Sequence, residues 1–231
     1  APAPGHWRDE AREVRRVSLP SLAERVLYHV GFLGFVLVIA RLGDDVMAAN
    51  QALISVESIC FLSADGFGIA AAALVAQKLG ARRPAEARRC AVIATQYSVV
   101  SLTALGVVFL VTRGAVLPLF SSEPRIVDVG ASAVWVLALA QPFMAAAIVV
   151  GQSLRGGGFT RAVLGVSAAG ALVVRLSCTY TLAVSLGLGL PGVWLGSTCD
   201  WVVRSVLLLF VGAAIARRAI RATRPASPAP S

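Results

Sequence analysis

Charged side chains that interrupt long apolar stretches are the first candidates for chemistry in this sequence. They are Glu24, Arg25, His29, Glu57, Asp65, Arg175, Asp200 and Arg204. A charge in a hydrocarbon environment costs from about 3 to over 10 kcal/mol unless a partner or water offsets it. Each of these residues is therefore expected to form an ion pair, to face water or to take part in function.

The first apolar stretch carries a carboxylate and an imidazole close together. Glu24 and Tyr28 are four residues apart and share one helical face. Arg25 and His29, also four apart, form the neighbouring face. A carboxylate beside a histidine can bind and release a proton or a cation, which is the chemistry of a proton- or cation-coupled carrier. Two roles stay open for Glu24 and His29, in ion coupling or in structural contacts such as a Glu24–Arg25 pair.

Polar side chains on two later stretches are further candidates for a cavity. Asn50 and Glu57 are seven residues apart, about two helical turns, and so share a face. Gln141 precedes Pro142, which removes a backbone hydrogen bond and is expected to kink its helix. These polar side chains are expected either to line a substrate cavity or to form hydrogen bonds between helices. Asp65 precedes a glycine and is expected to cap a helix that restarts there.

The last two apolar stretches carry a predicted ion-pair cluster. Asp200 and Arg204 are four residues apart and can pair within one helix. Arg175 lies on the preceding stretch at a depth from which it can reach Asp200. The preferred role is structural, fixing how the two helices dock, and the alternative is a substrate site.

The elements that position these residues are membrane-spanning helices. Of the 231 residues, 57% are hydrophobic and 14% are charged, and the mean hydropathy is +0.78. A soluble domain usually contains about 25% charged residues. The apolar stretches are long enough to cross a bilayer as helices, and nothing alternates as barrel strands do. The sequence predicts an all-α integral membrane protein.

Six spans make up the predicted transmembrane bundle. They are residues 18–41, 46–79, 87–112, 126–154, 160–186 and 193–215. The second is long for a perpendicular helix and is expected to tilt, or to break near residues 66–68. Residues 1–17 are expected to be a cytoplasmic linker cut from a longer chain, and residues 216–231 a basic, disordered cytoplasmic tail.

The basic residues predict the orientation of the bundle. One side collects Arg8, Arg12, Arg15, Arg16, Lys78, Arg82, Arg83, Arg88, Arg89, Arg155, Arg161, Arg217, Arg218, Arg221 and Arg224. The other side has only Arg41, Arg113 and Arg125. Because cytoplasmic loops hold the excess of arginine and lysine, both termini are expected in the cytoplasm. The predicted location is the inner membrane of a bacterium.

Several functional classes are disfavoured by the same residues. The net charge of +9 is spread over the ends of apolar stretches, which does not favour nucleic-acid binding. The four cysteines form no CxxC or other metal-ligand spacing, so no metal site is expected. With two histidines, no HExxH and no GxSxG, the sequence does not favour an enzyme or a bound cofactor.

Four stretches of the sequence are similar to motifs of one known transporter family. The first helix opens with VSLPSLAERVLYHVGF, and the second reads AANQALISVESICFLSADGFGIAAAALVAQKLGARRPAEARR. The fourth closes with QSLRGGGFTR, similar to the family's Arg-Gly-x-Gly-Asp-Thr-Arg. The last pair reads VVRLSCTYTLAVSLGLGLPGVWLGSTCDWVVRS, similar to its Gly-Val-Trp and Asp-Trp-x-x-Arg pattern. In these four stretches the chain resembles the multidrug and toxic compound extrusion (MATE) transporters, specifically one six-helix lobe, the C-terminal half. Ala76 and Phe159 depart from the family's Gly and Asp.

The resemblance implies half of a secondary active antiporter. It would export drugs or organic cations in exchange for H⁺ or Na⁺, and its partners would be the lipid bilayer, a small organic substrate and either an N-terminal lobe or a second copy. Many family members use a carboxylate of the N-terminal lobe, and others use a glutamate in the first helix of the C-terminal lobe, about two turns after the proline. This sequence has Tyr28 at that place, with Glu24 one turn earlier. The alternatives are a lipid-linked saccharide flippase of the same superfamily, which would need a more cationic cavity, and a non-transporting membrane scaffold.

Overall fold

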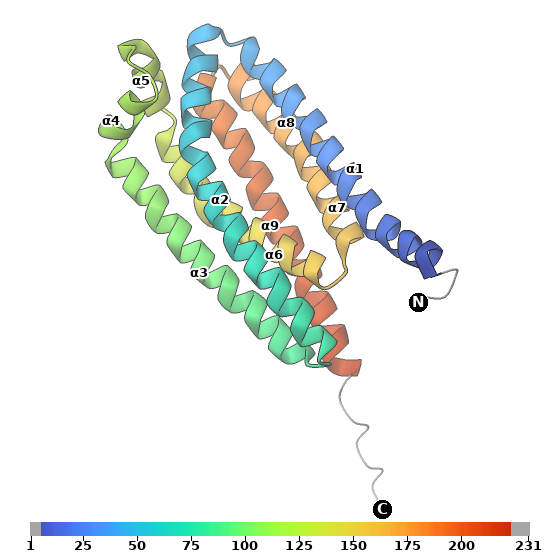
Figure 1. Cartoon of the computed structure of the whole chain (residues 1–231). Coiled ribbons are helices and arrows are strands. Elements are labelled where there is room, and N and C mark those ends of the chain that lie inside the picture. The colour runs from blue at the N-terminus through green and yellow to red at the C-terminus, as the bar shows by residue number, and fades with distance from the viewer. Residues whose placement is uncertain (1–5, 223–231) are drawn as a thin grey trace, which may run out of the picture.

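The computed structural model describes residues 6–222, and within these residues every element is a helix. The elements are α1 (His6–Ala40), α2 (Asp44–Gly80), α3 (Pro84–Val111), α4 (Arg113–Val116), η1 (Leu117–Leu119), α5 (Pro124–Ala131), α6 (Val134–Gly156), α7 (Thr160–Ala168), η2 (Ala169–Val174), α8 (Arg175–Thr179), η3 (Tyr180–Ser185) and α9 (Gly189–Ala222). The helices lie side by side as one elongated bundle (Figure 1).

Five helical segments of the described chain are long and apolar enough to cross a bilayer. They are α2, α3, α6, the run Thr160–Ser185 formed by α7 to η3, and Gly189–Arg218 of α9. The apolar end of α1, Arg25–Ala40, is a shorter sixth segment in the place of the first predicted span. The predicted all-α membrane fold is confirmed.

Helix α6 is the centre of the bundle. It packs against α2, α3 and α9. In its most apolar stretch 56% of the residues are buried, compared with 22–28% in the corresponding stretches of the other four segments. Small residues permit this close packing. A Cβ atom at Gly156 would collide with the backbone of Ala72 on α2, so only glycine allows these two helices to approach so closely.

The fifth span contains two π-helical stretches, η2 and η3, which flank the short helix α8. π-Helical turns are rare and occur frequently at functional sites. Gly170 lies in η2, and a Cβ atom there would collide with the side chains of Asp200 and Arg204 on α9. The absence of a side chain at this position therefore makes room for polar groups of α9 inside the bundle.

Helix α1 packs along this fifth span rather than into the centre (Figure 1). Its contacts are mainly with α7, η2 and α8. A Cβ atom at Gly31 would stand 3.1 Å from the carbonyl oxygen of Ala171, so the two backbones are close. This packing places Arg25 and His29 of α1 at a cavity that residues of α6 and α9 also line.

Several predicted boundaries are wrong. Helix α1 begins at His6, twelve residues before the predicted first span, so residues 6–17 of the predicted linker are helical, and their role as a linker stays a prediction. Helix α2 is continuous through residues 66–68, so of the two expected alternatives, a tilt or a break, the break does not occur. The predicted span 126–154 is two helices, α5 and α6, separated by a turn at residues 132–133. Helix α9 begins at Gly189 and includes residues 216–222 of the predicted tail, and residues 223–231 lie outside the described residues.

The two ends of the bundle differ in charge. Helix α1 begins and α9 ends at the same end, together with the α2–α3 connection, whereas α4 and α5 lie at the opposite end (Figure 1). The first end therefore carries the arginines of three separate segments: Arg12, Arg15, Arg82, Arg83, Arg217 and Arg218. This distribution agrees with the predicted alternation of spans, and the cytoplasmic location of that end stays a prediction.

Candidate functional site

A buried ion-pair cluster joins the fifth span to α9. The Nε atom of Arg175 donates to Oδ2 of Asp200 at 2.9 Å, and the Nε atom of Arg204 donates to Oδ1 at 2.6 Å. Asp200 is fully buried, and the two arginines are 6% and 5% exposed. The predicted contacts are present, and we call these three residues the ion-pair cluster. Its structural role stays a prediction.

Aromatic rings surround the arginines of the ion-pair cluster. The guanidinium carbons of Arg175 and Arg204 lie 5.5 and 5.1 Å from the centre of the Trp201 ring. Phe35 of α1 lies 5.7 Å from the Arg175 guanidinium carbon. Cations placed over aromatic faces are stabilised by the ring quadrupole. Trp201 therefore helps to hold two positive charges inside the bundle.

One cavity, of about 280 Å³, lies between α1, α2 and α9 beside the ion-pair cluster. We call it the Glu57 pocket. Its lining is aromatic and polar: Phe32, Phe35, Ile54, Glu57, Ser58, Phe61, Leu62, Arg175, Trp194, Ser197 and Trp201. Glu57 enters from α2, and Arg175 comes from the start of α8.

Three residues of the Glu57 pocket have buried polar atoms without a hydrogen-bond partner in the described part of the chain. They are Oε1 of Glu57 and the indole Nε1 atoms of Trp194 and Trp201. Buried polar groups are nearly always paired, so an unpaired acceptor and two unpaired donors around one cavity need an explanation. A ligand or an ion that enters the pocket would provide the missing hydrogen-bond partners.

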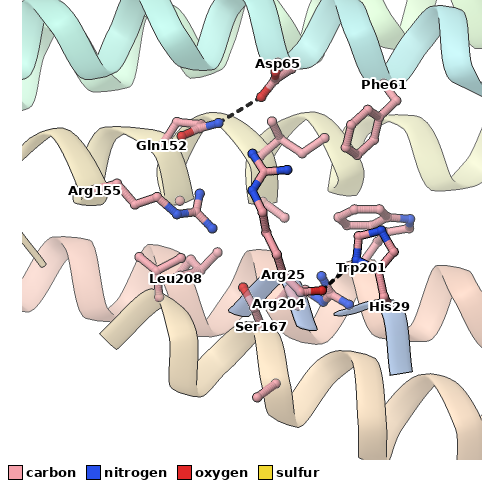
Figure 2. Close-up of a pocket in the computed structure, with 15 residues that line it drawn as sticks. Arg25, His29, Phe61, Asp65, Gln152, Arg155, Ser167, Trp201, Arg204 and Leu208 are labelled. Carbon is pink, nitrogen blue, oxygen red and sulfur yellow. Dashed lines mark hydrogen bonds between the residues drawn. The ribbon is translucent and has the colours of Figure 1, made fainter. Parts of the chain in front are cut away.

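A second cavity, of about 520 Å³, lies between α1, α2, α6, α7 and α9. We call it the arginine pocket, because three arginines line it: Arg25, Arg155 and Arg204. Figure 2 shows Arg25 and Arg155 pointing into this pocket from α1 and α6. Phe61 and Trp201 line both cavities, so the two pockets are neighbours.

Asp65 does not cap a restarting helix as the sequence predicts. Its Oδ1 atom accepts a hydrogen bond of 2.8 Å from Nε2 of Gln152, as Figure 2 shows. The bond connects α2 with α6 across the rim of the arginine pocket, where both residues are half-buried. Because α2 does not break after residue 65, there is no new helix start to cap, and the carboxylate serves an interhelical contact.

The structure brings some of the predicted site residues together and separates others. His29 lines the arginine pocket, and its Nδ1 atom lies 2.7 Å from the carbonyl oxygen of Arg25. Glu24 and Tyr28 belong to α1, but their side chains lie outside the described residues.

Asn50 and Gln141 line neither of these two pockets. Both are buried, and each has a side-chain oxygen without a hydrogen-bond partner among the described residues. The Nε2 atom of Gln141 donates to the carbonyl oxygen of Leu137 at 3.0 Å. Its Cγ atom lies where a side chain at Gly106 of α3 would be, so Gln141 faces α3.

Three residues of the pockets were not singled out from the sequence as site candidates. Arg155 contributed to the charge balance between loops and to the motif QSLRGGGFTR, and no site role was assigned to it. Trp194 and Trp201 read as family landmarks on α9, with no polar role assigned to their indole N–H groups. The two tryptophans could have been noticed from their spacing, because Trp194, Trp201 and Arg204 lie within three turns of one helix.

The family of this chain follows from comparison with known sequences. The sequence model of the MatE family matches residues 20–181, which is more than half of the chain. The chain therefore belongs to the MatE family, as its motifs indicate. It is a multi-pass membrane protein.

Individual relatives agree with this assignment. The probable multidrug resistance protein NorM of Thermotoga maritima is 25% identical over 94% of this chain and 47% of its own length. The human multidrug and toxin extrusion protein 1 is 28% identical over 84% of this chain and 34% of its own length. The crystal structure of the eukaryotic MATE transporter AtDTX14 superposes with a TM-score of 0.83 and 25% identity, covering 97% of this chain and 52% of that one. The chain spans about half the length of the curated bacterial relative.

Proposed function

We propose that this chain is one six-helix lobe of a secondary exporter that expels drugs or organic cations in exchange for H⁺ or Na⁺. Membership of the MatE family and the names of the relatives support the transport class. The second lobe would be an N-terminal half or a second copy of this chain. The protein would reside in a bacterial inner membrane with both termini in the cytoplasm, as the arginine distribution favours.

The observation that carries the coupling mechanism is the unpaired carboxylate oxygen of Glu57. Two other acids of the described spans have partners: Asp65 accepts from Gln152, and Asp200 accepts from two arginines. Glu57 instead leaves Oε1 without a partner and lines a cavity. A carboxylate in such a position can exchange a proton or a sodium ion for a cationic substrate. Its single negative charge is neutralised by one positive charge, so binding of the substrate displaces the coupling ion.

The aromatic lining of the Glu57 pocket supports a cationic substrate. Phe32, Phe61 and Trp194 offer ring faces, which attract a desolvated organic cation by about 2 kcal/mol or more. The volume of about 280 Å³ belongs to one lobe, and a second lobe facing it would complete a larger cavity. Alternation between the two sides of the membrane would then follow from rocking of one lobe against the other.

The test is ethidium efflux by the chain joined to its second lobe, in vesicles with an imposed pH or Na⁺ gradient. We expect Glu57→Gln to abolish the gradient dependence, because a neutral amide cannot exchange its charge. The matched control is Glu86→Gln, which changes an acid paired with Lys78 outside the pocket. A gradient dependence that Glu57→Gln leaves intact would remove Glu57 from the mechanism. The same assay with Glu24→Gln tests the coupling role predicted for that residue.

A further inference from the structure

A third cavity, of about 450 Å³, lies between α3 and α9 at the end of the bundle where basic residues gather. Figure 1 shows the beginning of α3 and the end of α9 at this end. Helix α6 packs against both helices and contributes its last turns to the lining, and Phe159 follows from the connection to α7. We call this cavity the Phe159 groove. It shares no lining residue with the Glu57 pocket or the arginine pocket.

The walls of the Phe159 groove are largely apolar. Val92, Phe159 and Leu209 line it and are exposed in the described structure. The hydroxyl groups of Thr95 and Ser153 donate to carbonyl oxygens of their own helices, each at 2.8 Å, so they do not need a partner in the groove. Phe159 stands where the family pattern has aspartate, so this chain presents a ring instead of a charge. The lining therefore favours a hydrocarbon.

The length of the groove matches one leaflet of a bilayer. It follows α3 from Pro84 to Gln96, a rise of about 18 Å along the helix axis. Half of the hydrocarbon core of a bilayer is about 15 Å thick. An acyl chain that lies along α3 would therefore have apolar walls over the whole depth of its leaflet.

The charge at the groove complements a phosphate. Arg88 lines the groove and is exposed. In residues 78–89 and 209–218 the one acid is Glu86, and it accepts a hydrogen bond of 2.7 Å from Lys78. The basic residues of the same two segments, besides Arg88, are Lys78, Arg82, Arg83, Arg89, Arg217 and Arg218. Basic segments at the cytoplasmic surface attract anionic lipids, and this end of the bundle is the predicted cytoplasmic one.

We propose that the Phe159 groove is a binding site for one anionic phospholipid. An acyl chain lies between α3 and α9 against Phe159 and Leu209, and the phosphate contacts Arg88, whose planar fork of donors matches two phosphate oxygens. A zwitterionic phospholipid binds more weakly, because its ammonium group offsets the charge of its phosphate. The site is separate from the proposed efflux cavity, so its test needs no transport.

Native mass spectrometry of the 231-residue chain released from detergent micelles tests the headgroup contact. The chain is titrated with dioleoyl phosphatidylglycerol, which is anionic, or with dioleoyl phosphatidylcholine, which is zwitterionic. We expect a lower Kd for phosphatidylglycerol, and we expect Arg88→Gln to raise that Kd by about fivefold, the contribution of one arginine at an anionic surface. The control is Arg89→Gln, which changes an exposed arginine that does not line the groove and should leave the Kd unchanged.

A second substitution tests the acyl-chain contact without changing a charge. Gly212 lines the groove from α9, and a Cβ atom there would stand 3.7 Å from the nearest side-chain atom, an ordinary contact. Gly212→Leu should therefore fold and fill part of the groove. We expect it to raise the Kd for phosphatidylglycerol by about tenfold, because methylene groups of the lipid lose their burial. The control is Gly165→Leu, which adds the same side chain where a Cβ meets open space.

Three outcomes would overturn the proposal. Equal Kd values for phosphatidylglycerol and phosphatidylcholine would show that the headgroup charge is not recognised. Equal losses from Arg88→Gln and Arg89→Gln would show a general attraction to the basic end instead of a site. A lipid-free dimer of the parent chain that Gly212→Leu dissociates would show that a second copy of the chain occupies the groove. If Arg88→Gln folds poorly, Arg88→Lys retains the charge, and its Kd should stay close to that of the parent chain.

Discussion

Replacing Asp200 with alanine tests the reasoning about buried charge in this bundle. The carboxylate is fully buried and accepts hydrogen bonds from Arg175 and from two nitrogens of Arg204. Alanine would remove all three bonds and leave two guanidinium groups inside the bundle without their shared counter-ion. The helices that lose their connection are the fifth span and α9, which also line both pockets.

The magnitude follows from the burial of the three partners. Removing one partner of a buried ion pair costs about 3–5 kcal/mol, because the remaining charge is left uncompensated in a medium that solvates it poorly. At about 1.4 kcal/mol per factor of ten, the equilibrium constant for unfolding should rise by about a hundredfold or more. The cation–π contacts of Trp201 do not replace the lost carboxylate, since a ring face offers only a partial charge.

The assay is titration of the chain in mixed micelles with sodium dodecyl sulfate, followed by the fluorescence of its four tryptophans. The matched control is Asp128→Ala on α5, which removes an exposed acid and should change the free energy of unfolding by less than about 0.5 kcal/mol. In the complete transporter, Asp200→Ala should lower the folded yield more than the transport rate per folded molecule. Equal stability of the two variants, or normal yield with no transport, would refute the structural role of the ion-pair cluster.

Three further tests probe separate contacts. Gly170→Ala should destabilise the chain by about 1–3 kcal/mol, because the new Cβ would collide with the ion-pair cluster. The control is Gly165→Ala, whose Cβ meets open space and which should leave the stability unchanged. Thermal unfolding in detergent compares the two variants. A double-mutant cycle with Asp65→Asn and Gln152→Leu should give a coupling energy of about 1.5–3 kcal/mol, and additive effects would show that their bond is not formed. Asp45→Asn breaks an exposed salt bridge to α5 and should cost less than about 1 kcal/mol in the same unfolding assay, so a larger loss would contradict the exposure of the pair.

The sequence predicted the membrane fold and the ion-pair cluster because both depend on local patterns. Hydropathy identifies helices long enough for a bilayer, and a spacing of four residues puts Asp200 and Arg204 on one helical face. The predictions from the sequence were wrong where packing between helices determines the local structure. The glycines of α2 left a break open as an alternative to a tilt, yet Gly68 packs against Gln152 of α6, and the helix is continuous.

The pockets could not be predicted because they depend on how helices distant in sequence meet. Arg155 and Arg25 belong to different helices, and only the packing of the bundle shows that they point into one cavity (Figure 2). The polarity of Gln141 suggested a cavity, but its side chain instead fills the space beside Gly106. Glu57 was recognised from its depth in the span, whereas its unpaired oxygen depends on the rotamers of surrounding helices.

The central claim is that this chain is one lobe of an exporter, and ethidium efflux from energised bacterial cells tests it most directly. Cells would express this chain alone, or this chain together with a separate N-terminal lobe, at matched membrane levels. We predict efflux from the pair of lobes, or from this chain alone if two copies of it pair, and its loss with Glu57→Gln. The absence of efflux from both proteins at normal membrane levels would contradict the claim and favour a flippase or a scaffold.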